Sequence, residues 1–103
     1  MPIPPDWKNP IHVRPGATQT HVDPALLLPS RPDLWRTRLE AQRQLLLAGI
    51  RRITPILVTS DGIIYDGHHA VRAAAEESRT VDVQVTDATA ASVGLTILEL
   101  PVR

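Results

Sequence analysis

Residues that could bind an anion or move a proton stand together in the run Asp66-Gly67-His68-His69, and Arg72 follows one helical turn later. A glycine that leads into a helix leaves amide N–H groups unpaired, and together with the helix dipole they attract an anion such as phosphate. A guanidinium one turn further on could bind two phosphate oxygens. The pattern predicts a phosphate-binding corner, without indicating what is done to the phosphate.

The acid and the two histidines, our candidates for catalytic residues, leave several roles open. Asp66 could be a Mg²⁺ ligand, a general base or only the cap of its own turn. His68 and His69 are adjacent, so their side chains diverge on a helix and form a poor metal pair. One of them could hold an anion while the other packs. Arg72 could equally be a surface residue that pairs with Glu76 four residues later.

A short hairpin and a helix are expected to position this corner. Residues 56–58 form an apolar, β-branched-rich run, the Asp-Gly pair at 61–62 is a two-residue turn signal, and residues 63–65 resume the strand. Gly67 permits a backbone angle that a Cβ would resist. The Ala-rich segment 68–77 is expected to be helical. The pattern is therefore strand, turn, strand and an abrupt helix start.

The rest of the chain predicts one α/β (α+β) domain, a small mixed sheet with packed helices, over residues 19–103, after a proline-rich arm over residues 1–18. The helix expected from Ser30 has an early Pro and an acid after its Ser cap. Its apolar stripe is expected to face the core: Trp35, Leu39, Leu46 and Ile50. In chain order we expect short strands at 11–13 and 20–22, a helical turn at 25–28, a helix from Ser30 to about Ala48 with Gly49 as its C-cap, a strand of alternating valines at 81–86 and a last helix from Asp87 or Thr89 to about Leu98.

Composition narrows the function classes. The 103 residues include no Cys, which excludes disulfides, thiolate metal sites and a cysteine nucleophile. No apolar run reaches the roughly 20 residues that span a membrane, and no signal-peptide core is present, so we expect a cytoplasmic protein. Six arginines lie in residues 31–52, which could be a solvated helix face or a surface that faces nucleotide or nucleic acid. With only 3% aromatic residues, we expect DNA contact to be weak and non-specific.

The order of these motifs resembles the ParB/sulfiredoxin superfamily. The strings are Pro55-Ile56-Leu57-Val58, then Asp61-Gly62, then Asp66-Gly67-His68-His69-Ala70-Val71-Arg72-Ala73-Ala74. Members of that superfamily typically read P-I-x-V, a short hairpin and a G-[EH]-[RH]-R-x-x-A-like box that opens a helix. The upstream strings Val22-Asp23-Pro24 and Pro29-Ser30-Arg31-Pro32 are similar to the family's lead-in, so the likeness covers residues 20 to 87.

The resemblance implies a ParB/sulfiredoxin-like fold and a nucleotide, either CTP, ATP or ADP, held with Mg²⁺ at the box. Either Asp66 or Glu99 would hold the Mg²⁺ or act as a base. Ala70 stands where the family often has Arg, no helix-turn-helix follows the box, and the sulfiredoxin cysteine is absent. The residues implied for the polyphosphate site are Gly67, His68, His69 and Arg72, to which we add Arg31 from the lead-in as a nucleotide-binding residue.

Three functions therefore stay open. The first is a nucleotide-binding module that could act as a small phosphotransferase or nucleotide hydrolase. The second is a DNA-associated ParB-like nuclease or a partition-type accessory module. The third is a non-catalytic interaction domain of a toxin or regulatory system. Whether the chain is an enzyme, and whether it forms a homodimer, are left open by the sequence.

Overall fold

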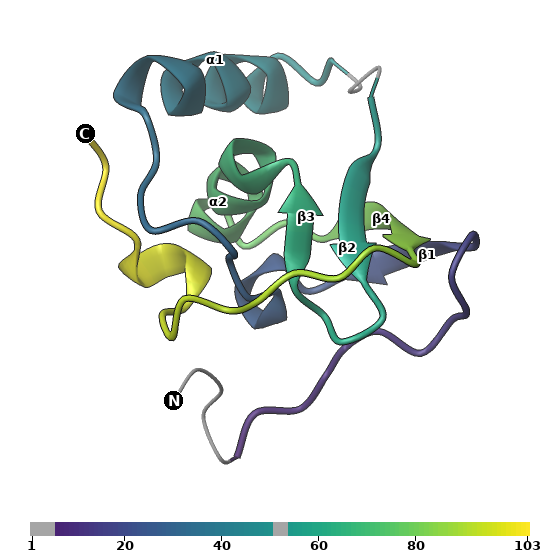
Figure 1. Cartoon of the computed structure of the whole chain (residues 1–103). Helices are drawn as coiled ribbons and strands as arrows, with labels where there is room; N and C mark the ends of the chain where they lie inside the picture. The colour runs from purple at the N-terminus through teal and green to yellow at the C-terminus, as the bar shows by residue number, and fades with distance from the viewer. Residues whose placement is uncertain (1–5, 51–53) are drawn as a thin grey trace.

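The computed structural model describes residues 6–50 and 54–103. The first five residues of the predicted arm, and Arg51 and Arg52 of the arginine-rich stretch, lie outside the described residues. The described chain forms an α+β fold with a four-stranded mixed sheet in the order β1-β4-β2-β3 (Figure 1). Its elements are β1 (Thr18–Val22), the 3-10 turn η1 (Pro24–Leu26), α1 (Arg36–Leu47), β2 (Ile56–Thr59), β3 (Ile64–Asp66), α2 (His68–Glu76), β4 (Val81–Thr86) and the 3-10 turn η2 (Ile97–Glu99).

The sheet confirms the predicted hairpin and the predicted valine strand. β2 pairs antiparallel with β3 and parallel with β4, and β4 pairs antiparallel with β1. Along β4, Val83 and Val85 are buried while Asp82 and Gln84 are exposed, as the alternation indicates. This alternation leaves one face of the sheet for the core.

The hairpin loop is longer than the predicted two-residue turn. Thr59 N–H donates to the Ile63 carbonyl at 2.8 Å, and Gly62 N–H donates to the Thr59 carbonyl at 3.0 Å. Three residues therefore form the loop, with Gly62 at a φ of 82°. Hairpins with three-residue loops commonly have a left-handed residue at this last position. The loop is held further by the buried Thr59 hydroxyl, which accepts from Ile63 N–H at 3.2 Å.

An aliphatic core lies beneath α2, and α1 packs on the other side of that helix (Figure 1). α2 buries Val71 and the three alanines at 73–75, whose small side chains allow close packing. The core cluster itself consists of Ile11, Val22, Leu27, Leu34, Ile56, Val58, Ile64, Val71, Ala75, Val83, Val85, Ile97 and Leu100.

The helix expected to begin after a Ser30 cap begins instead at Arg36, after Trp35, so this prediction is wrong by five residues. The Ser30 hydroxyl donates to the Ile64 carbonyl at 2.6 Å and does not cap a helix. Trp35 occupies the N-cap position without a side-chain cap. The predicted stripe is also partly wrong, because Trp35 is 46% exposed and Ile50 58% exposed, and Leu39 is the residue of α1 that is buried. The helix ends as predicted, with Gly49 at a φ of 72°.

Two other predicted elements are absent from the described residues. Residues 11–13 form no strand, because the Gln19 side chain accepts from His12 N–H at 2.9 Å and donates to the Pro10 carbonyl at 2.7 Å. Residues 87–96 form no helix, and Val93 N–H pairs instead with the Pro29 carbonyl at 3.1 Å. Only the single turn η2 follows β4, where Thr96 and Glu99 cap each other.

The described part of the proline-rich arm packs against the hairpin and η1. Trp7 Nε1 donates to the Leu26 carbonyl at 2.9 Å, and Asn9 Nδ2 donates to the Ser60 carbonyl at 2.8 Å. Ile11 enters the core. None of the helices in residues 6–50 and 54–103 is long and apolar enough to cross a membrane.

Candidate anion-binding site

The corner between β3 and α2 has the backbone geometry that the sequence predicts. Gly67 is the N-cap of α2 with a φ of 104° in the left-handed region, and no side chain caps the helix. A Cβ at this position would lie 3.2 Å from Ile56 Cγ1. The first turn of α2 therefore offers backbone N–H groups to an outside acceptor.

Replacing Gly67 with Ala should lower the free energy of unfolding by about 1–3 kcal/mol, because the side chain meets both an unfavourable φ and Ile56. Gly49 is the matched control, since it also has a positive φ but a Cβ there would contact nothing within 4 Å. Urea unfolding should show a larger loss for Gly67→Ala than for Gly49→Ala. Equal losses of unfolding free energy in the two variants would mean that the Ile56 side chain moves aside without destabilising the fold.

A cavity of about 250 Å³ opens at this corner, between α1 and the N-terminus of α2. It brings together most of the predicted site residues and adds one that the sequence analysis missed, Arg38 on α1. Among the described residues, Arg38 has no hydrogen-bond or ion-pair partner. The cavity is lined by Arg31, Arg38, Ala41, Gln42, Asp66, Gly67, His68, His69 and Ala70.

Two arginines, Arg31 and Arg38, and one acid, Asp66, line this cavity, so positive charge exceeds negative charge in its lining. Arg31 Nε donates to the Asp33 carbonyl at 2.7 Å, and its Nη2 is 3.9 Å from the Asp33 carboxylate. Burial lowers the pKa of His69, and the charges of Arg31 and then Arg38 lower it further. Both guanidinium groups therefore act on the same space, which favours a bound anion.

The two histidines diverge, as expected, and each accepts a backbone N–H from the segment that precedes α1. His68 Nε2 accepts from Ser30 N–H and His69 Nε2 accepts from Trp35 N–H, both at 3.0 Å. Both residues are buried, at 7% and 9% exposure. A neutral imidazole that accepts at Nε2 carries its proton at Nδ1. The rings therefore fix the segment that carries Arg31, and neither Nε2 is free to act as a base in this state.

Burial lowers the pKa of His68 to about 4, and the positive charge of Arg31 adds to this effect. The hydrogen bond from Ser30 N–H requires the same neutral ring. His68 is therefore uncharged at neutral pH. It can contribute to an anion site by holding Ser30 in place through Nε2 or by donating a hydrogen bond from Nδ1–H.

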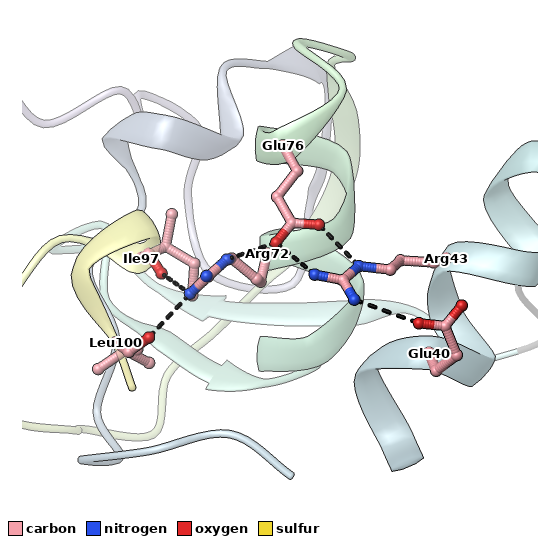
Figure 2. A network of polar contacts seen from close by, with 6 residues as sticks. All are labelled: Glu40, Arg43, Arg72, Glu76, Ile97 and Leu100. Carbon is pink, nitrogen blue, oxygen red and sulfur yellow. Dashed lines mark hydrogen bonds and ion pairs between the residues drawn. The ribbon is translucent and has the colours of Figure 1, made fainter. Parts of the chain in front are cut away.

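Arg72 does not line this cavity, and its expected position on an exposed helix face is wrong. Its side chain is 13% exposed, and its Nε donates to Glu76 at 2.9 Å (Figure 2). Its Nη1 donates to the carbonyls of Ile97 and Leu100, at 3.1 and 2.9 Å. The pairing with Glu76 is thus as predicted, but the guanidinium also holds the C-terminal turn.

Glu76 links both helices through a pair of arginines, as Figure 2 shows. It accepts two hydrogen bonds of 2.8 Å from Arg43 on α1, in addition to the one from Arg72. The hydrogen bonds from Arg43 lower the pKa of the Glu76 carboxyl. Arg43 also contacts Glu40 at 3.2 Å. The network fastens α1 to the C-terminal half of α2, while Arg38 on the same helix lines the cavity at the N-terminus of α2.

Glu99, the predicted metal ligand, has a structural contact in η2. Its carboxylate accepts from Thr96 N–H at 2.7 Å, and this hydrogen bond lowers its pKa. Within the described part of the chain, no group of three or more His, Cys, Asp or Glu side chains could hold a metal ion by itself. A Mg²⁺ ion at this site would therefore depend on phosphate oxygens and water molecules for most of its ligands.

A second cavity of about 300 Å³ adjoins the first, because Gln42 and Ala70 line both. Its walls are mainly apolar and come from α1, α2 and the sheet. They include Leu45, Leu46, Ile50, Pro55, Ile56, Ala73, Ala74, Val81 and Val83. The two cavities together suit a ligand with an anionic end and an apolar or planar body.

No protein-family model, curated protein or solved structure matches this chain.

Proposed function

We propose that the chain is a nucleotide-binding module whose phosphates lie at the N-terminus of α2. The observation that carries the proposal is the placement of Arg31 and Arg38 beside a helix N-terminus that begins at a left-handed glycine and has no side-chain cap. Backbone N–H groups and guanidinium groups are the usual partners of phosphate oxygens. This arrangement supports the nucleotide site that the resemblance to the ParB/sulfiredoxin superfamily implies.

The adjoining apolar cavity supports a nucleotide over inorganic phosphate. A base and ribose would extend from the phosphate cavity past Gln42 and Ala70 into the space beneath α1. The cavity's aliphatic walls would cover the faces of the base, and its few polar groups would set base preference. Asp82 and Gln84 on β4 are two of these polar groups.

Asp66 is the residue on which a catalytic role would depend. It lines the phosphate cavity from the end of β3 and is exposed. Beside bound phosphates its carboxylate would hold Mg²⁺ or accept a proton from an attacking hydroxyl or water. Phosphoryl transfer requires mainly positioning and charge neutralisation, which Arg31, Arg38 and the helix N-terminus would supply.

A thermal-shift panel tests the proposal. ATP, ADP, CTP, GTP and pyrophosphate, each with and without Mg²⁺, are compared with adenosine and with NaCl of equal ionic strength. Binding to the folded state raises the melting temperature by mass action. We expect at least one nucleotide to stabilise the protein more than pyrophosphate and adenosine do. No stabilisation by any phosphate compound would refute the proposal.

A further inference from the structure

The segment that carries Arg31 is held on one side by the histidines and on the other by the C-terminal residues. Residues 101–103 lie parallel to residues 34–36, with backbone hydrogen bonds of 2.8 to 2.9 Å between them. Arg72 fixes the start of this C-terminal segment through the Leu100 carbonyl. The C-terminal residues therefore lie close to the anion cavity in the fold without lining it.

Asp33 in this segment lies between two arginines. Its Oδ2 is 2.7 Å from Arg103 Nε, whereas its Oδ1 is 3.9 Å from Arg31 Nη2. The closer carboxylate contact is thus the one with Arg103. Because Arg31 also lines the anion cavity, the Asp33 carboxylate and a bound anion would compete for the same guanidinium.

We infer that Arg103 and Asp33 are positioning residues that set how strongly Arg31 attracts an anion, and this inference rests on the proposed function. While Arg103 pairs with Asp33 Oδ2 at 2.7 Å, Arg31 keeps only the longer contact of 3.9 Å with Oδ1, and its guanidinium can still act on the cavity that it lines. When residues 101–103 separate from residues 34–36, Asp33 pairs closely with Arg31. The Asp33 carboxylate then neutralises the positive charge that Arg31 presents to the cavity. Displacement of the C-terminal segment therefore weakens binding of phosphates at the cavity.

Calorimetric titration with pyrophosphate tests this coupling in the full chain. Arg103→Ala should bind about twofold to fivefold more weakly than the parent, the range expected for one partly exposed ion pair. Adding Asp33→Asn to Arg103→Ala should restore the affinity, because the competing carboxylate is gone. Adding Asp87→Asn, which makes the same change in net charge at an exposed residue, should not restore it. Arg103→Ala that binds as tightly as the parent would overturn the inference.

A measurement without ligand separates this inference from the proposed function. The Nε–H resonance of the Arg31 guanidinium, assigned by NMR, should shift in Arg103→Ala and return in Asp33→Asn/Arg103→Ala. If the parent binds no pyrophosphate, the proposed function fails, while this signal still shows whether Asp33 changes its partner. An Arg31 resonance that stays in place in Arg103→Ala, at an unchanged melting temperature, would overturn the coupling.

Discussion

Replacing Glu76 with Gln should lower the free energy of unfolding by about 1–3 kcal/mol, between the ranges for exposed and for buried ion pairs, because the side chains of Glu76 and Arg43 are 23% and 34% exposed. The carboxylate accepts hydrogen bonds from Arg43 and Arg72, at 2.8 and 2.9 Å. A neutral amide would leave both guanidinium groups with an incomplete set of acceptors, and one amide hydrogen would face them. Because Glu76 and Arg72 are mostly buried, water compensates for this loss only in part.

Glu77 is the matched control, since it is the next residue, is exposed and makes no side-chain hydrogen bond or ion pair within the described residues. Glu77→Gln should change the free energy of unfolding by less than about 0.5 kcal/mol. Urea denaturation at pH 7 compares the two variants. Similar losses in both would show that the Arg43–Glu76–Arg72 network adds little to the attachment of α1.

The free energy of unfolding should fall by an amount on the order of 3 kcal/mol between pH 7 and pH 4, because of His68. The folded-state pKa of His68 is about 4, below the ordinary value of 6.5. Below pH 6.5 the unfolded chain binds a proton that the folded chain does not, so stability falls as the pH falls. The loss levels off below pH 4, where both states are protonated. His69, whose pKa is also lowered, should add to the loss.

His68→Gln provides the test, because glutamine can accept from Ser30 N–H but does not titrate. Its stability should be lower than that of the parent at pH 7 and should depend less on pH between 7 and 4.5. The pKa of Glu76 is lowered from its ordinary value of 4.5, so protonation of Glu76 reduces stability mainly below pH 4.5, outside this window. A parent protein whose unfolding midpoint in urea is constant from pH 7 to pH 4.5 would contradict the assignment of a buried neutral His68.

The parts of the fold that the sequence predicts well are those with a local cause. The Asp-Gly pair, the alanines of α2 and the alternating valines of β4 each determine their element within a few residues. The φ of Gly67 follows from the same local pattern, because a strand must turn abruptly into a helix there. The corner between β3 and α2 could therefore be located from sequence, together with Asp66 and the two histidines that line its cavity.

The parts that could not be predicted depend on contacts between distant segments. Ser30 looks like a helix cap, but its N–H and hydroxyl are used by His68 and Ile64, which lie 38 and 34 residues away. Arg38 becomes a site residue only because α1 packs over the N-terminus of α2. Arg72 has the right spacing for phosphate, yet it turns to carbonyls of the C-terminal segment. No local pattern in the sequence indicates these partners.

Calorimetric titration of the Arg38→Ala variant with pyrophosphate tests the anion site most directly. Arg38 lines the cavity and has no ion-pair partner in the described part of the chain, so its removal should leave the fold intact. The loss of a charged hydrogen-bond donor should weaken binding by about 1.5–3 kcal/mol. Arg36→Ala, an exposed arginine of the same helix outside the cavity lining, should bind like the parent. If Arg38→Ala binds pyrophosphate as tightly as the parent and Arg36→Ala do, phosphates do not bind at the N-terminus of α2.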